Sequence, residues 1–257
     1  LAPLAEAQQP ASATPHGKST AHVSAKSPAK PTLSLNIRDL GATGDGTTKD
    51  TLPIQLTIER CSLLGGGEVV VPAGNYLTGA LALRTNVTLR IEKDATLHGS
   101  PDLADYPLSE VRWEGRWIEG YIGFISATDA TNIAILGPGR ILGSDAIRGR
   151  VIPGKIIGTA PNGRPIRATG RRLPALIEFV NCKNVRVADL DTQQFGMWSI
   201  HPALCQNVAF HNVVIKSGAD GIDVDSCQHV VIDGCDFSTG DDCISLKSGR
   251  GEEAFSP

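Results

Sequence analysis

Two adjacent carboxylates, Asp241 and Asp242, stand in the segment STGDDCISLKSG at residues 238–249. Neighbouring like charges raise the free energy of a folded chain unless one group is protonated or a cation is bound. A third acid, Asp220, comes 22 residues before Asp242, in the segment GADGIDVDSC. Whether these three carboxylates can act together depends on how the fold places residues that are 22 positions apart.

A cluster of carboxylates supports two reactions on polysaccharides. In glycoside hydrolysis, one carboxylic acid protonates the leaving oxygen while another carboxylate activates water or attacks the sugar. Crowding favours a protonated carboxyl near neutral pH, which a general acid requires. In a β-eliminating polysaccharide lyase, the carboxylates would instead bind Ca²⁺. A solvated aspartate ladder, an incidental calcium site or a carbohydrate-binding module without catalysis are the other interpretations.

The chain contains an internal repeat with a period close to 22 residues. A polar residue, a short alternating run and a second short run recur from Asn86, Asn132, Asn184, Asn207 and His229. This pattern is typical of a right-handed parallel β-helix, in which each repeat is one coil and coils stack about 4.8 Å apart. The recurring asparagines predict a side-chain ladder at a turn. A β-sandwich with accidental spacing is the alternative fold.

Alignment of three consecutive coils by their glycines predicts which side chains share a column. Side-chain alternation points two columns into the core: Ile200, Ile222 and Ile244, and Pro202, Val224 and Leu246. Two further columns point outward: His201, Asp223 and Ser245, and Ala203, Asp225 and Lys247. The same alignment stacks Asp220 beside Asp242, with Asp241 next to them. The repeat therefore predicts that the three acids form one outward-facing cluster.

The two ends of the chain differ from the repeat. Residues 1–31 are rich in Ala, Pro, Ser, Thr and Lys, and we interpret them as a disordered tail or the remnant of a signal peptide. Residues 32–257 predict one β-helix domain, with a short helix near residues 50–64 covering its amino-terminal end. The chain stops about one coil after Asp242, so we expect a domain truncated at its carboxy terminus that is nearly inactive alone.

Net charge, hydropathy and cysteine spacing restrict the classes of partner and metal that are expected. The formal net charge is -3 and no apolar run approaches the roughly 20 residues of a membrane span, so neither nucleic acid nor a membrane is expected. The six cysteines form no CxxC motif, which argues against a zinc site and a disulfide scaffold. Cys182, Cys205 and Cys227 recur at the coil spacing and predict a buried stack of thiols.

Several cations are candidates for binding an acidic substrate. His201, as an exposed residue, fits either substrate binding or a ladder. Lys247 is a candidate either for an ion pair with Asp225, which shares its column, or for a contact with a uronate carboxylate. Arg250 is a candidate for the same uronate contact. The loop at residues 144–172 carries seven cations against one acid, Asp145, which suits a polyanion or a solvated loop: Arg148, Arg150, Lys155, Arg164, Arg167, Arg171 and Arg172.

The segments MWSIHPALCQNV, DGIDVDSC and TGDDCISLKSGRG resemble glycoside hydrolase family 28, the polygalacturonases and their relatives. The segments DLGATGDGTTKDT and GGGEVVVPAGNYLTGAL resemble the amino-terminal part of bacterial members. The resemblance implies inverting hydrolysis of a pectic polysaccharide without cofactor or metal, with Asp241 as general acid and Asp220 and Asp242 holding the water. It also implies a secreted or periplasmic monomer, and leaves endo and exo action open.

The chain departs from that family pattern at two places. Gly218 and Ala219 stand where the family has Asn-Thr before the aspartate, which alters the positioning of substrate. The later Gly-His-Gly and Arg-Ile-Lys motifs, which contact substrate in the family, do not occur before the final GRGEEAFSP. We therefore interpret the chain as an amino-terminal fragment of a longer enzyme.

Overall fold

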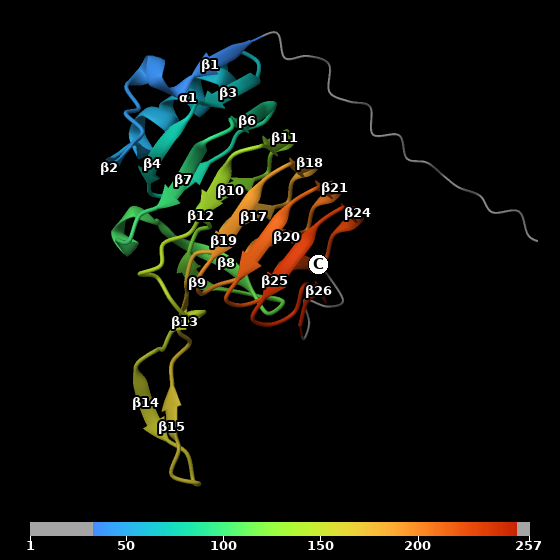
Figure 1. Cartoon of the computed structure of the whole chain (residues 1–257). Coiled ribbons are helices and arrows are strands. Elements are labelled where there is room, and N and C mark those ends of the chain that lie inside the picture. The colour runs from blue at the N-terminus through green and yellow to red at the C-terminus, as the bar shows by residue number, and fades with distance from the viewer. Residues whose placement is uncertain (1–32, 251–257) are drawn as a thin grey trace, which may run out of the picture. The chain divides into compact units, whose positions relative to one another are not determined.

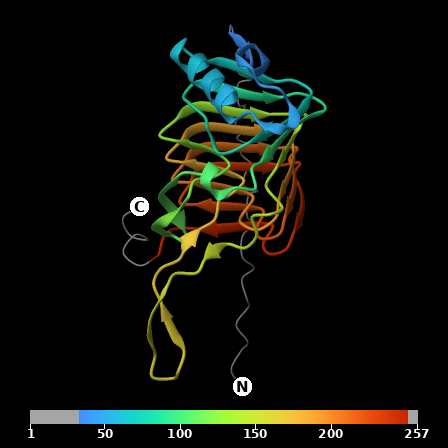
Figure 2. The same ribbon diagram turned by 90° about the vertical axis from the view of Figure 1, so that its left-hand side faces the viewer.

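The computed structural model describes residues 33–250, in which the chain winds through three stacked parallel sheets (Figures 1 and 2). Each coil adds one strand to each sheet, as in β17 (Ile177–Val180), β18 (Lys183–Ala188) and β19 (Asp191–Gln194). The fold is the predicted right-handed parallel β-helix. Residues 1–31, which we interpreted as a tail or signal remnant, and residues 251–257 lie outside the described part.

The three sheets are named here by number. Sheet 1 contains, in spatial order, β1 (Ser34–Asn36), β3 (Gly67–Val71), β6 (Val87–Ile91), β11 (Thr131–Leu136), β18, β21 (Gln206–His211) and β24 (Gln228–Asp233). Sheet 2 contains β2 (Asp45–Lys49), β4 (Gly74–Thr78), β7 (Ala95–Gly99), β12 (Arg140–Leu142), β19, β22 (Val214–Ser217) and β25 (Asp236–Thr239). Sheet 3 contains β5 (Leu81–Ala82), β10 (Ile125–Thr128), β17, β20 (Ile200–Ala203), β23 (Ile222–Asp225) and β26 (Ile244–Lys247).

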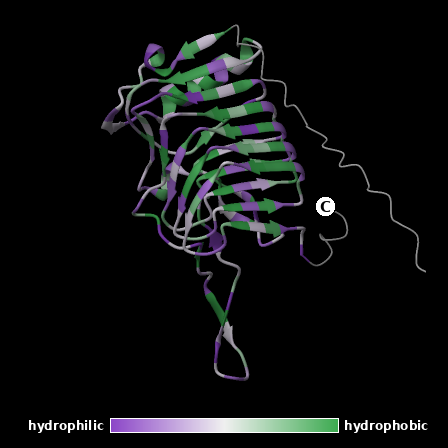
Figure 3. Cartoon of the chain, turned by 45° about the vertical axis from the view of Figure 1, so that its right-hand side comes forward, coloured by the Kyte–Doolittle hydropathy of each residue, from purple (hydrophilic) through white to green (hydrophobic). Residues whose placement is uncertain are grey.

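The strand register confirms the predicted 22-residue offset. Ile200 pairs with Ile222, and Ile222 pairs with Ile244, so these isoleucines form one column of sheet 3. Ile200 and Ile222 are fully buried in the core, and the alternation of apolar and polar residues along the strands is visible in Figure 3. Ile244 and Leu246 are exposed, because β26 is the last described strand of its sheet.

The predicted asparagine ladder runs along one turn of the coils. Hydrogen bonds of 3.0, 2.8 and 3.0 Å join Asn86, Asn132, Asn184 and Asn207 through their side-chain amides. Each of these residues has a positive φ between 56° and 64°. Asparagine tolerates this left-handed conformation, and its amide both donates and accepts, so it suits a position that must turn the chain and bond to the next coil.

The predicted helix caps the first coils. The helix α1 (Thr51–Leu63) buries Ile54, Ile58 and Cys61, which are spaced at one helical face, against the first strands of sheet 1. Short 3₁₀ turns, η1 (Ile37–Leu40) and η2 (Leu103–Asp105), complete the described helical segments. No helix within residues 33–250 is both long and apolar enough to cross a bilayer.

Two insertions lie outside the regular coils. The first, called the hairpin below, comprises β8 (Leu108–Trp113) and β9 (Arg116–Tyr121), which pair antiparallel. The second, called the arm, comprises residues 150–172. At its base, β13 (Val151–Ile152) pairs with β16 (Arg171–Arg172), which in turn joins β9. Beyond this base, β14 (Ile156–Thr159) and β15 (Pro165–Arg167) project away from the coils (Figure 1).

Candidate active site

The three predicted acids occupy equivalent loops on two neighbouring coils. Asp220 lies between β22 and β23, and Asp241 and Asp242 lie between β25 and β26, where the chain passes from sheet 2 to sheet 3. The Gly221 amide donates a 2.8 Å hydrogen bond to the Asp242 carbonyl, so the two loops stack directly. The predicted stacking of Asp220 and Asp242 is therefore confirmed for their backbones, and the Asp241 and Asp242 side chains are exposed.

Arg150, at the base of the arm, bridges two of the acids. Its Nη2 lies 2.5 Å from Asp241 Oδ2 and 3.5 Å from Asp220 Oδ1. The Arg150 side chain is 38% exposed and that of Asp241 is 50% exposed, whereas Asp220 is buried. The hydrogen bond from Arg150, and then its charge, lower the pKa of the Asp241 carboxyl. Asp241 is consequently an ionised, solvent-accessible carboxylate in this state.

A buried contact between a lysine and an aspartate lies beneath Asp220. Lys247 Nζ is 2.6 Å from Asp223 Oδ1 and 3.8 Å from Asp220 Oδ2. Burial lowers the pKa of Lys247, but the hydrogen bond and charge of Asp223 outweigh it and raise that pKa above its ordinary value. Burial raises the pKa of Asp223 to about 8, in spite of Lys247, and the neighbouring Asp220 adds to this rise. The site thus holds a carboxyl that changes charge near neutral pH.

The hairpin covers the outer face of sheet 3. The Trp113 ring stacks on the Trp198 ring with centroids 4.7 Å apart. The Trp198 ring also makes a cation–π contact with Lys247, whose Nζ lies 4.7 Å from the ring centroid. Trp198 occupies the loop one coil before Asp220 and is fully buried. The two outward columns point away from the core, as predicted. The expectation that their side chains reach solvent is wrong, because the hairpin lies over them.

His201 belongs to this buried layer. It was expected to be exposed, and that expectation is wrong: its exposed fraction is 0%, and its Nδ1 lies 3.0 Å from Glu178 Oε1. Glu178 also accepts hydrogen bonds from Arg172, which is itself fully buried. Burial raises the pKa of Glu178, but the charge of Arg172 and hydrogen bonds from Arg172 and His201 outweigh it and lower that pKa to about 2.

The other two binding candidates have different surroundings. Lys247 pairs with Asp223 and not with Asp225, so the stacked ion pair expected within its own column is wrong in its partner. Asp225 is fully buried and pairs with Arg112 of the hairpin at 2.9 Å. Arg250 is exposed and follows β26, where its backbone packs against Gly115 in the turn of the hairpin.

Sequence reasoning missed the residues that the two insertions bring to the site. Arg150 was one of seven cations in residues 144–172, and nothing in its spacing distinguished it. Trp113 and Arg112 lie outside the repeat and carry no periodic signal. The column of Glu178, His201 and Asp223 did carry a signal that could have been used. Chemically complementary side chains one coil apart indicate that the groups pair with each other in a buried layer, and not that each is solvated.

The stack of thiols formed as predicted. The Cys182 amide donates to Cys205 Sγ at 3.4 Å, and the Cys205 amide donates to Cys227 Sγ at 3.3 Å. All six cysteines of the chain are free. Among residues 33–250, no group of three or more His, Cys, Asp or Glu side chains is arranged to hold a metal ion.

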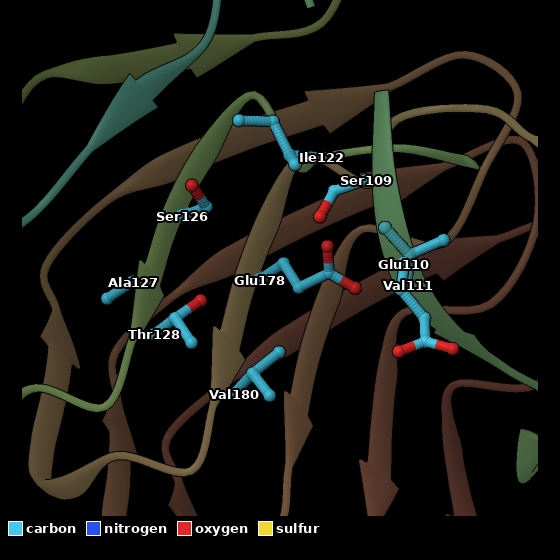
Figure 4. A pocket seen from close by; sticks show the side chains of 9 residues that line it. All are labelled: Ser109, Glu110, Val111, Ile122, Ser126, Ala127, Thr128, Glu178 and Val180. Atoms are coloured by element: carbon cyan, nitrogen blue, oxygen red, sulfur yellow. The ribbon is translucent and has the colours of Figure 1, made fainter. Parts of the chain in front are cut away.

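A small cavity of about 60 Å³ opens on the other side of Glu178. It is lined by residues of β8, β10 and β17 together with Ile122 (Figure 4). The Glu178 carboxylate points toward Ser109 of the hairpin in Figure 4, and its Oε2 accepts a hydrogen bond from the Gly123 amide at 3.2 Å. None of the three acids lines this cavity, so it is separate from the loops that carry them.

The comparisons with known proteins identify the family of the chain. The family model for glycosyl hydrolases family 28 matches residues 61–255, which include all three acids. The chain belongs to glycosyl hydrolases family 28. A protein of Vitis vinifera named probable polygalacturonase is 30% identical over 232 residues, covering 85% of this chain and 45% of its own length.

Two solved structures of this family are similar in fold. A hyperthermoactive exopolygalacturonase from Thermotoga maritima gives a TM-score of 0.75 at 31% identity, covering 89% of this chain and 57% of that one. A family 28 exopolygalacturonase from Yersinia enterocolitica gives 0.72 at 28% identity, covering 89% and 47%. The chain spans about half the length of the curated relatives that it matches.

Proposed function

We propose that this family 28 protein hydrolyses galacturonosyl linkages of a pectic polysaccharide with inversion at the anomeric carbon. The observation that carries the proposal is the meeting of an exposed carboxylate, Asp241, with the stacked pair of Asp220 and Asp242 at one edge of the coils. Crowded carboxylates on open, neighbouring loops are the groups that this reaction needs.

The environments of the acids suggest their roles. Asp241 is exposed and can present a proton to the leaving oxygen, which makes it the general acid. Asp220, with Lys247 3.8 Å away, and Asp242 on the stacked loop would hold and activate the water. The proton that the base takes from the water balances the proton that Asp241 gives to the leaving oxygen.

The substrate would be a polyanion. The exposed cations of the arm are Lys155, Arg164 and Arg167, and the arm contains no acidic residue. Arg250 is exposed beside the hairpin turn. These charges would attract a uronate polymer. We propose His201 and Lys247 as residues that position the site beneath this surface, since both are largely buried.

Residues 32–257 would form one β-helix domain of a secreted or periplasmic protein, because its proposed substrate is a polymer of the cell wall. The similar proteins named exopolygalacturonases suggest cleavage from a chain end. The length distribution of the products separates this mode from internal cleavage, since exo action releases short products from the first minutes.

The test is product analysis with the full-length protein and polygalacturonate. We expect saturated reducing sugars, an inverted anomeric configuration by NMR and no loss of activity in EDTA. Asp241→Asn should slow product release by about 10²–10⁴-fold, while substitution of an exposed aspartate of β25, Asp236→Asn, should not. An unsaturated product that absorbs in the ultraviolet and disappears on chelation would replace the proposal by a lyase, and binding without any product by a carbohydrate-binding module.

A further inference from the structure

Arg150 lies between two carboxylates that the proposed reaction must use separately. One nitrogen of its guanidinium contacts Asp241 at 2.5 Å and Asp220 at 3.5 Å. An inverting hydrolase separates its acid from its base by roughly 6.5–9.5 Å, so that the water and the scissile bond fit between them. In the described state the guanidinium occupies part of this space. It must move before a sugar can react there.

The backbone that carries Arg150 is fixed on two sides. The Leu173 amide donates a 2.9 Å hydrogen bond to the Arg150 carbonyl, which ties it to the residue that directly follows β16. A Cβ on Gly196 would come within 2.6 Å of the Gly149 amide nitrogen, so the chain before Arg150 packs closely on the coil. Arg148 also lies over the Phe195 ring at 5.6 Å. Only the end of the Arg150 side chain, which is 38% exposed, is free to change partner.

The protonation state of Asp241 also conflicts with its proposed role. A general acid must carry a proton when it meets the glycosidic oxygen. A guanidinium in hydrogen-bond contact favours the ionised carboxylate, because opposite charges within about 4 Å stabilise each other. The resting site therefore has an acid without its proton, and the group responsible is Arg150.

We propose that Arg150 makes the acid step depend on a carboxylate in the substrate, by leaving Asp241 for the uronate when the polymer binds. This inference rests on the proposed function. Once released, Asp241 takes up one proton from bulk water, to which it is exposed, and gives it to the leaving oxygen. A neutral sugar offers no carboxylate for the guanidinium, so Arg150 stays on Asp241 and the acid stays ionised. Arg150 is thus a specificity-determining residue for acidic polymers.

The charged groups that face Asp241 come from three elements. Arg150 approaches from the arm, and Asp220, Asp242 and Lys247 come from the coils. Glu114 acts on both Arg150 and Lys247 from the turn of the hairpin. Of these, Arg150 is the group in hydrogen-bond contact with Asp241, and its hydrogen bond is the largest influence on that carboxyl. Removal of Arg150 should therefore change Asp241 more than any other single substitution around it.

The experiment compares Arg150→Gln with the full-length wild type on two oligogalacturonides, one with free carboxylates and one fully methyl-esterified. The variant should lose activity on the acidic substrate and gain activity on the neutral one. We expect the ratio of the two kcat/KM values to fall by about tenfold or more, the scale of one charge-assisted hydrogen bond. The basic limb of the pH profile on the neutral substrate should move to higher pH. Arg60→Gln, an exposed cation of α1 at the amino-terminal end of the coils, is the matched control and should leave the ratio unchanged.

The outcomes separate the possible roles of Arg150. Equal losses on both substrates with an unmoved pH limb would show a structural role and overturn the inference. A loss on the acidic substrate alone, with unchanged activity on the ester, would show simple binding and would also overturn it. If the wild type releases no reducing ends from either substrate, the proposed function itself fails. A direct readout independent of turnover is the ¹³C titration of Asp241, whose pKa should rise in Arg150→Gln.

Discussion

Two arginines at the base of the arm pair with carboxylates of the coils in opposite ways. Arg172 is fully buried, and its partner Glu178 is 4% exposed and receives further hydrogen bonds from His201 and the Gly123 amide. Arg150 is 38% exposed, and its partner Asp241 is 50% exposed. Arg150 directly precedes Val151, which pairs with Arg172 across the base of the arm, so the two arginines share one local structure.

The difference indicates what each pair does. A buried pair that loses one partner leaves an uncompensated charge in a medium of low dielectric. Substitutions in such a pair are therefore limited by the stability that they remove. An exposed pair contributes little to stability and can exchange partners with a ligand. We infer that the Arg172–Glu178 pair holds the hairpin and arm on sheet 3, while the Arg150–Asp241 pair belongs to the chemistry.

Glu178→Ala should produce the largest loss of stability. It leaves the fully buried Arg172 without its carboxylate, and we expect the free energy of unfolding to fall by about 3–5 kcal/mol. Urea denaturation of the full-length protein measures this. The matched control is Glu119→Ala, which removes the partner of Arg171, the neighbour of Arg172, at a pair that is about half exposed. A loss no larger than that of Glu119→Ala would refute the structural role of the buried pair.

The lowered pKa of Glu178 predicts that stability depends on pH in the acidic range. Its pKa is about 2 in the folded chain and 4.5 for an ordinary glutamate. A lowered folded pKa gives stability that is present above pH 4.5 and is lost as the pH falls toward 2. Thermal unfolding across this range should show the midpoint falling in the wild type and falling less in Glu178→Gln. Parallel curves for the two proteins would show that Glu178 is not held ionised.

Asp223 predicts the opposite slope at higher pH. Burial raises its folded pKa to about 8 from an ordinary 3.8, so its contribution to stability is fully present below pH 3.8 and is lost as the pH rises through 8. Asp223→Asn cannot ionise and should therefore lose less stability than the wild type between pH 4 and pH 8. The comparison uses unfolding midpoints at matched ionic strength, and an identical slope in both proteins would contradict the account.

Part of this arrangement could be predicted from the sequence because it repeats. The 22-residue offset placed Ile222 opposite Ile244 and Asp220 beside Asp242, and the asparagines formed their ladder, since both depend only on neighbouring coils. The insertions do not repeat. The contact between Trp113 and Trp198 joins residues 85 positions apart through a hairpin whose docking depends on tertiary packing. For that reason His201 was expected at the surface and was found buried.

Arg150 shows the same limit at the site itself. Seven cations of residues 144–172 were visible in the sequence. The structure shows Arg172 in a buried pair, Arg171 in a surface pair, Arg148 over an aromatic ring and Arg150 bridging Asp241 and Asp220. Composition gave the charge of the arm but not its distribution, because only the pairing of β13 with β16 decides which residues face the coils.

Arg150→Gln should have the smallest effect on stability of the variants considered. Exposed ion pairs contribute roughly 0–1 kcal/mol, and the backbone of Arg150 keeps its hydrogen bond from Leu173. We therefore expect a change of less than about 1 kcal/mol by urea denaturation. A loss comparable to that of Glu178→Ala would remove the contrast between the two pairs.

The most direct test of the central claim is kcat for Asp241→Asn in the full-length protein, measured on polygalacturonate together with its unfolding midpoint. Asp241 is exposed and its neighbours remain in place, so folding should be unaffected. General acid catalysis contributes about 10²–10⁴-fold, and we expect kcat to fall by that factor with the midpoint unchanged. A variant that keeps wild-type turnover would show that the acid lies elsewhere and that the cluster of three aspartates is not the catalytic centre.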